Sequence, residues 1–115
     1  MILHVASDNY LLPIFQGTPA PASTGITSDF NTAGAFEKRK LNKAEIMADL
    51  TASFQHIHRA IAPTTDQNLT ETIKLFGQDF TRQRAMILTV NHLHEHLGQL
   101  IAYARMNNVT PPWSK

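Results

Sequence analysis

Residues 85–104, AMILTVNHLHEHLGQLIAYA, decide the fold. Their apolar members recur every three or four positions, the spacing at which side chains share one face of a helix. The pattern extends both ways and predicts a helix over about residues 81–107. Asn107 and Asn108 favour its end there, because asparagine tolerates the left-handed conformation of a helix C-terminus and two prolines follow. The sequence therefore predicts an all-α domain built around this long helix.

Two further helices are expected before it. One covers about residues 2–15, and Pro13 should kink or end it. The other covers about residues 42–61. Asn42 and Glu45 begin it with the spacing of a capping box, in which each side chain accepts a hydrogen bond from the other residue's backbone N–H.

The segments between the helices predict how the helices are connected. Residues 16–41 contain glycines and prolines among small polar residues, which indicates a loop. About 25 residues is long for a link between antiparallel neighbours, so this crossover should join helices that run parallel or lie far apart. Residues 69–76 are expected to add one or two helical turns. The chain, residues 1–115, is interpreted as a single domain.

The last helix carries two adjacent seams of different character. One is apolar and predicts plain core packing. The other is mixed, and at about 100° per residue its six members lie within roughly 80° of one another. A helix with two such seams packs against two neighbours, and the second junction should hold something polar. The apolar seam is Met86, Val90, Leu93, Leu97, Leu100 and Ala104; the mixed seam is Ala85, Thr89, His92, His96, Gln99 and Tyr103.

The mixed seam makes His92 and His96 candidate metal ligands. They are four residues apart, so their imidazoles can reach one ion from the same side of the helix. Two ligands do not complete a site, and a third must come from another helix. His4 is available near the start of the first helix, with Asp8 one turn later to hydrogen-bond its ring. Spacing does not select His4, and histidines in such positions are also common as solvated or structural residues.

The remaining histidines are weaker candidates. His94 should lie at the rim, and His56 should be solvated. His58 shares the apolar side of its helix and competes for a ligand role. Three further side chains could orient a substrate or a ligand histidine from the long helix, and they are Glu95, Gln99 and Tyr103.

Both ends of the chain resemble the DinB-like (damage-inducible) family. The segments that carry the resemblance are LHVASDNY at residues 3–10, HLHEHLGQ at 92–99, YAR at 103–105 and PPWS at 111–114. The resemblance implies a four-helix bundle with up-down-down-up connectivity and a long crossover. It also implies a metal site of three histidines at one end of the bundle, made here by His4, His92 and His96, with zinc or nickel as the usual ion.

The resemblance further implies a helix before the opening motif, whereas this chain starts three residues before His4. Three helices would leave one flank of the core exposed, at about 25 cal/mol per Å² of apolar surface. Either the chain is truncated, or a partner subunit covers the flank. A homodimer is the expected form of that partnership.

The activities that the resemblance implies are those of thiol-dependent transferases and isomerases or of metal-dependent hydrolases. The chain has no cysteine, so a low-molecular-weight thiol would have to enter as a cosubstrate. The alternative is a non-enzymatic or degenerate bundle that acts through association.

Composition argues against other classes of function. The formal net charge is +1 and the basic residues are scattered, which gives no basis for a nucleic-acid partner. No apolar run approaches the roughly 18 residues that a membrane span needs, and no helix has the basic polar face of a membrane-surface helix. The first residues do not form a signal peptide. We therefore expect a cytoplasmic protein that acts on a small molecule.

Overall fold

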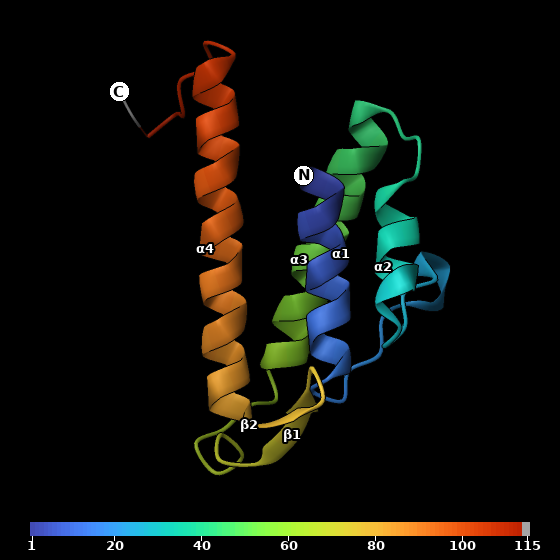
Figure 1. Ribbon diagram of the computed structural model, residues 1–115, viewed down its shortest axis with the longest axis vertical. Coiled ribbons are helices and arrows are strands. Elements are labelled where there is room, and N and C mark those ends of the chain that lie inside the picture. Colours follow the sequence, from blue (N-terminus) through green and yellow to red (C-terminus); the bar gives the residue numbers. More distant parts are fainter. Residues whose placement is uncertain (114–115) are drawn as a thin grey trace.

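The computed structural model describes residues 1–113, and in that range it contains four α-helices and one β-hairpin (Figure 1). The three predicted helices are confirmed to within one residue at each end. Ser114, part of the C-terminal motif, and the expected domain end at residue 115 lie outside the described residues. The elements are α1 (Ile2–Ile14), the 3-10 turn η1 (Ala22–Thr24), α2 (Phe30–Glu37), α3 (Lys43–Ile61), β1 (Thr72–Leu75), β2 (Gln78–Thr81) and α4 (Arg82–Met106).

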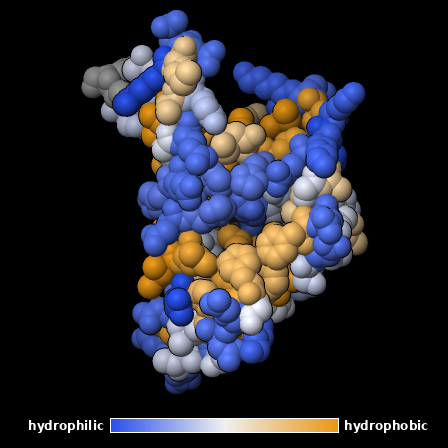
Figure 2. All heavy atoms as spheres, viewed as in Figure 1, coloured by the Kyte–Doolittle hydropathy of each residue, from blue (hydrophilic) through white to orange (hydrophobic). Residues whose placement is uncertain are grey.

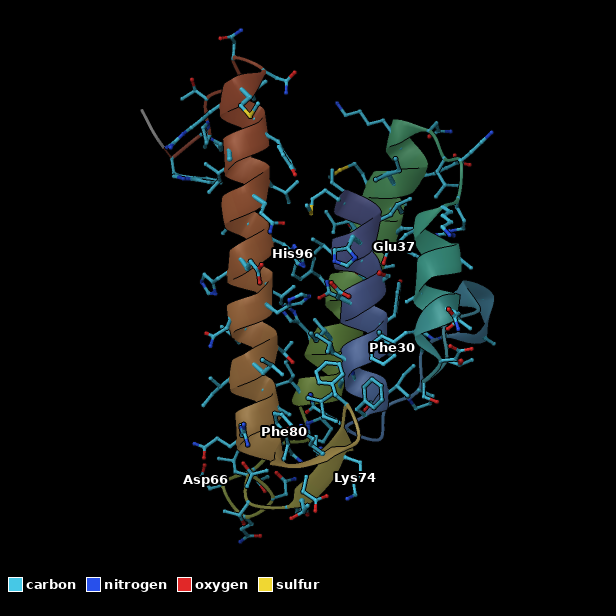
Figure 3. All side chains as sticks on the ribbon, in the orientation of Figure 1. Phe30, Glu37, Asp66, Lys74, Phe80 and His96 are labelled. Atoms are coloured by element: carbon cyan, nitrogen blue, oxygen red, sulfur yellow. The ribbon has the colours of Figure 1, made fainter. Side chains whose placement is uncertain are left out.

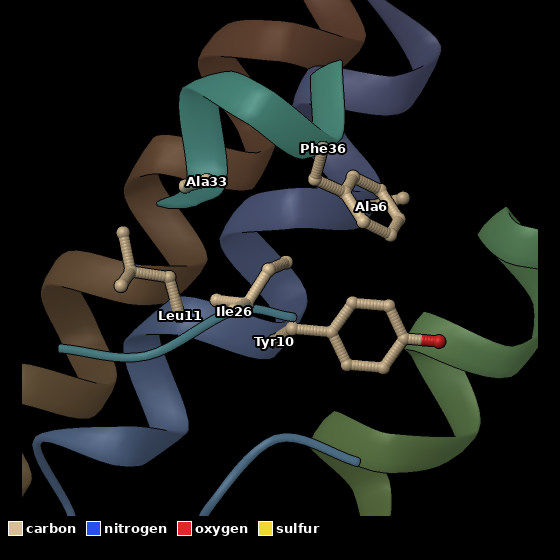
Figure 4. Close-up of a cluster of buried hydrophobic side chains, with 6 residues drawn as sticks. All are labelled: Ala6, Tyr10, Leu11, Ile26, Ala33 and Phe36. Carbon is tan, nitrogen blue, oxygen red and sulfur yellow. The ribbon is translucent and has the colours of Figure 1, made fainter. Parts of the chain in front are cut away.

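Helix α1 lies at the centre, with α2, α3 and α4 around it (Figure 1). Every residue from Val5 to Pro13 is buried, so the middle of this helix is covered on all sides. It ends one residue after Pro13, close to the expected position. On the side of α1 that faces α2 and the crossover, a cluster of buried side chains forms the core (Figure 4). The cluster consists of Ala6, Tyr10, Leu11, Ile26, Ala33 and Phe36.

The crossover is not a loop throughout, so that prediction is wrong for the residues of α2. The Asp29 carboxylate accepts a hydrogen bond from the backbone N–H of Asn31 at 2.9 Å and caps the helix. Phe36 is buried against Tyr10 of α1, with ring centroids 5.9 Å apart. Glycine is a poor helix former, so Gly34 in the middle of the helix concealed the pattern. Tertiary packing on α1 overrides that local preference.

The all-α prediction is also wrong at residues 69–76, which were expected to be helical. β1 pairs antiparallel with β2, and Leu75 lies opposite Gln78 in the register. Phe76 and Gly77 form the two-residue turn, with φ of 53° and 74°. Two consecutive left-handed residues are typical of the type I′ turn, whose twist suits a hairpin. Glycine adopts that conformation readily, whereas phenylalanine rarely does.

Local hydrogen bonds fix the ends of the long helices as predicted. The backbone N–H of Asn42 donates to Glu45 Oε2 at 2.7 Å, and the backbone N–H of Glu45 donates to Asn42 Oδ1 at 3.0 Å. The capping box at the start of α3 is therefore confirmed. After α4, Asn108 adopts the expected left-handed conformation, with φ of 58°.

The long helices α1 and α3 run in the same direction and α4 runs opposite to both (Figure 1). The crossover therefore returns the chain to the end where α1 began, as its length predicted. Through the hairpin the chain then enters α4, which lies beside α1. None of the helices among residues 1–113 is long and apolar enough to cross a membrane.

Helix α4 faces α1 with its mixed seam, in which Ala85, Thr89 and His96 are buried. The apolar seam was expected to be plain core, and that prediction is wrong. Val90 and Leu97 are 49% and 45% exposed. Helical periodicity correctly groups these residues on one face, but no helix of the described part of the chain covers that face.

Candidate metal centre

Four side chains meet where α4 crosses α1. His4 and Asp8 lie one turn apart on α1, and His92 and His96 lie one turn apart on α4. Each offers one nitrogen or oxygen atom, and the four atoms lie within 4.8 Å of one another. In Figure 3, His96 lies between the two helices. The structure thus brings together the three histidines singled out in the sequence, with a carboxylate among them.

Asp8 is at the centre of the cluster. Its Oδ2 atom lies 2.9 Å from His92 Nε2 and 3.5 Å from both His4 Nε2 and His96 Nε2. The two α4 histidines approach each other as well, with 3.0 Å between their Nε2 atoms. Asp8 and His96 are buried, whereas His4 and His92 are partly exposed. Three imidazoles therefore converge on one buried carboxylate oxygen, with an open side at His4 and His92.

The tautomer of His96 follows from its hydrogen bond to Gln99. Gln99 Nε2 donates to Glu95 Oε1 at 3.5 Å, so the Gln99 carbonyl oxygen is the atom that faces His96. That oxygen lies 3.0 Å from His96 Nδ1 and can only accept, so Nδ1 carries the proton. His96 Nε2 therefore carries no proton, and its lone pair faces the cluster, where it can accept a hydrogen bond from His92 Nε2 at 3.0 Å.

His4 is oriented in the same way by α2. Its Nδ1 donates to Glu37 Oε1 at 2.9 Å, and the Ser7 hydroxyl donates to the same oxygen at 2.8 Å. Burial raises the pKa of the Glu37 carboxyl, but the hydrogen bonds from His4 and Ser7 outweigh it and leave that pKa below its usual value. An ionised Glu37 holds the proton on Nδ1, so His4 Nε2 also presents a lone pair to the cluster.

The donor set fits a divalent cation. Three imidazole nitrogens with one carboxylate oxygen suit zinc and neighbouring metals. Tetrahedral ligands at zinc–nitrogen distances of about 2.0–2.1 Å are separated by roughly 3.3 Å. The separations between the Asp8 oxygen and the three nitrogens, 2.9 to 3.5 Å, bracket that value, and all four donor atoms lie within 4.8 Å of one another.

A pocket of about 400 Å³ opens beside the cluster. Its size lies in the range of small-molecule sites, which are typically mostly apolar with a few polar groups. One wall is polar, from His4, Asp8, Glu37 and His92. The other walls are apolar and come from α1, α2, the hairpin turn and the start of α4. A small molecule can therefore reach the partly exposed side of the cluster.

The three residues predicted to orient a substrate or a ligand are placed differently from one another. Gln99 contacts His96 directly. Glu95 is exposed, and its Oε2 lies 3.9 Å from His92 Nδ1, beyond hydrogen-bond distance. Tyr103 is exposed, and it belongs neither to the four-residue cluster nor to the lining of the pocket beside it.

The other histidines lie outside the cluster. His94 is exposed as expected, and its ring bonds the Val90 carbonyl on its own helix. His58 is exposed on α3. The prediction that His56 is solvated is wrong, because it is 5% exposed and packs against Tyr10 with ring centroids 5.3 Å apart. Helix α1 covers a side of α3 that its hydrophobic pattern did not mark.

Two parts of the site were not predicted in their full role. Asp8 was expected only to orient His4, yet it lies at hydrogen-bond distance from His92 and faces all three imidazoles. Its spacing of four residues from His4 was the available signal. Glu37 was missed because it lies at the end of a helix that the sequence pattern did not reveal.

The sequence matches the family model described as the DinB superfamily over residues 2–100, a span that includes the whole cluster. No curated protein and no solved structure matches the chain significantly.

Proposed function

Because this chain belongs to the DinB superfamily, we propose that His4, His92 and His96 bind one divalent metal ion, with Asp8 as a fourth ligand. The observation that carries the proposal is the convergence of four donor atoms within 4.8 Å from two different helices. Imidazole nitrogens accept zinc and nickel, which are the ions we expect.

We propose that the reaction is a group transfer with a small thiol as cosubstrate. Metal-dependent hydrolysis at the same site is the alternative. When bound, a divalent ion would act as a Lewis acid and stabilise a thiolate or polarise a substrate oxygen. Glu37 and Gln99 hold the proton of the His4 and His96 rings on Nδ1, so that the unprotonated Nε2 of each ring faces the cluster. The thiol is a cosubstrate, since the chain has no cysteine. The adjoining pocket gives it room.

Metal retention tests this proposal. Purified protein, loaded with zinc or nickel and dialysed, should hold one ion per chain by elemental mass spectrometry. His92→Ala and His96→Ala should lose it. His94→Ala is a matched control, because His94 lies on the same helix with an exposed ring outside the cluster. Equal retention by all four proteins would remove the proposed site.

A second candidate function is association through an apolar groove. The groove lies between α3 and α4, has a volume of about 360 Å³ and includes three residues of the apolar seam of α4, Leu93, Leu97 and Leu100. We propose that a second copy of the chain covers this groove in a homodimer and completes the helical bundle. The lining residues are Val5, Leu50, Phe54, Leu93, His94, Leu97 and Leu100.

Light scattering after size exclusion tests the association. The wild-type chain should be a dimer, and Leu97→Glu should make it monomeric because a carboxylate would be buried in the groove. Ile87→Glu is the control, since Ile87 is an exposed residue of α4 outside the groove. A wild-type monomer at high concentration would exclude the dimer and leave the metal proposal standing.

A further inference from the structure

Three phenylalanine rings form an aromatic cluster next to the proposed metal site. Phe15 follows α1, Phe30 begins α2 and Phe76 occupies the hairpin turn. The centroid of Phe30 lies 5.9 Å from that of Phe15 and 5.8 Å from that of Phe76, both in stacked arrangements. Phe30 and Phe76 are nevertheless 51% and 53% exposed. About half of the surface of Phe30 and of Phe76 is therefore accessible to another molecule.

The backbone at Phe76 is unusual. Its φ of 53° lies in the left-handed region, which a bulky residue rarely adopts. The first position of a type I′ turn favours asparagine, aspartate or glycine, each of which would form this hairpin with less strain. Strained residues that persist often have a functional role. The turn thus holds an aromatic ring where the backbone alone favours a small polar residue.

The aromatic rings and the histidine–aspartate cluster share one pocket. Phe30, Phe76 and Leu88 line its apolar part, and His4, Asp8 and His92 line its polar part. On the face shown in Figure 2, an apolar patch lies directly beside a hydrophilic band that extends between α4 and the other helices. Figure 3 labels Phe30 at the start of α2, beside α1. A ligand in this pocket would contact both kinds of surface at once.

We propose that the pocket binds a small molecule with an aromatic body, which lies against Phe30 and Phe76 while its polar head reaches His4, Asp8 and His92. This inference rests on the proposed function for the head group and names the class of substrate that the site accepts. Offset stacking on a half-exposed ring favours a planar body over an aliphatic one of similar size. The pocket volume of about 400 Å³ suits a molecule of this kind.

Two hydroxamates separate the contributions of head and body. Acetohydroxamate and benzohydroxamate carry the same metal-binding head, and only the second has an aromatic ring. On the zinc-loaded wild-type protein we expect benzohydroxamate to bind about tenfold more tightly in a calorimetric titration, from the apolar area and stacking of the ring. The measured quantity is the ratio of the two dissociation constants.

Two variants test whether the ratio of the dissociation constants depends on the rings of Phe30 and Phe76. Phe76→Asn places a residue that suits the turn at the strained position, so the hairpin is retained while the ring is lost. Phe30→Leu keeps an apolar side chain but removes the aromatic face. Both should bring the ratio down severalfold. Trp113→Ala is the control, because Trp113 is an exposed aromatic residue that does not line this pocket, and it should leave the ratio unchanged.

A second measurement does not depend on metal. Benzyl alcohol added to the metal-free protein should shift the backbone amide resonances of residues 30–34 and 76–77 in a ¹⁵N–¹H spectrum. Shifts confined to the α3–α4 groove, or no shifts, would overturn the proposal. An unchanged hydroxamate ratio in Phe76→Asn and Phe30→Leu would also overturn it. If neither hydroxamate binds and no metal is retained, the proposed function fails, and the benzyl alcohol spectrum alone decides the aromatic subsite.

Discussion

The His4 imidazole and the Glu37 carboxylate form a hydrogen bond of 2.9 Å, from Nδ1 to Oε1, between residues 33 positions apart in the chain. This contact connects the start of α1 to the end of α2. It also fixes the His4 proton on Nδ1 and leaves Nε2 free to face Asp8. A carboxylate in this position makes the histidine a stronger ligand, because it supports the partial positive charge that develops on a coordinated ring.

Glu37→Gln should weaken zinc binding by about tenfold, toward the lower end of the range for loss of such a contact. The amide oxygen can still accept from Nδ1, but its charge is gone. Competition against a chelating dye measures the change. Asp66→Asn is the paired control, since Asp66 is an exposed carboxylate that belongs neither to the four-residue cluster nor to the lining of the pocket beside it. An equal or larger loss in Asp66→Asn would contradict the role assigned to Glu37.

The contrast between the capping box and the Glu37 contact explains what the sequence could predict. Asn42 and Glu45 are three residues apart, and the rule that joins them is local. His4 and Glu37 meet only after α2 forms and packs on α1. The local pattern of α2 is weakened by Gly34, and its stability comes from burial of Phe36 against α1. A rule based on residues that are close in the sequence cannot predict such a contact.

The seams of α4 show a different limit. Periodicity identified the residues that share a face, and it correctly indicated that the mixed seam meets another helix. It could not say which of the two faces is covered, because that depends on the position of α1. The apolar seam, with Leu97 45% exposed, shows that helical spacing can group residues on one face without indicating whether another helix covers that face.

The start of α3 offers a direct test of the capping box. Asn42→Ala removes the acceptor for the Glu45 backbone N–H and should lower the free energy of unfolding by about 1 kcal/mol. Urea unfolding followed by circular dichroism measures it. Thr51→Ala is the control, since Thr51 is exposed within the same helix and alanine is the better helix former. A loss no greater than that of Thr51→Ala would show that the cap adds nothing to stability.

His56 should make stability fall as the pH falls. Burial lowers the pKa of its imidazole, and the nearby positive charge of Arg59 lowers it further. At a pH between the two pKa values, the histidine of the unfolded chain, with an ordinary pKa of about 6.5, is protonated, whereas that of the folded chain is not. The free energy of unfolding should decrease from pH 6.5 downward, until the pH reaches the lowered pKa of the folded state.

Urea unfolding of metal-free protein between pH 7.5 and 5 tests this expectation. His56→Leu removes the titrating group and should give a shallower decline than the wild type. The difference in slope between the two proteins gives the contribution of His56 to the pH dependence. It separates this contribution from those of the other histidines and of Tyr10, whose ring packs against His56. Parallel declines would mean that His56 does not contribute to the acid sensitivity.

Metal binding should order α4 more than any other helix. The buried residues of α4 are Ala85, Thr89 and His96, so the helix has little buried surface beyond the proposed site. An ion held by both α1 and α4 would fasten the two helices together at His92 and His96. Ion at about 100 times its dissociation constant stabilises the bound form by roughly 2.7 kcal/mol. Local opening of α4 near the site should become rarer by up to about a hundredfold.

Hydrogen exchange with and without zinc measures that effect along the chain. Amides of residues 92–100 should slow most, and those in the first half of α3, which contributes no residue to the cluster, should change least. His96→Ala should abolish the difference, because the bridge between the helices loses its buried ligand. Equal slowing of α3 and α4 would point to a general stabilisation in place of a bridge. No slowing in wild-type protein that retains zinc would place the ion elsewhere, because an ion shared by α1 and α4 cannot leave their relative motion unchanged.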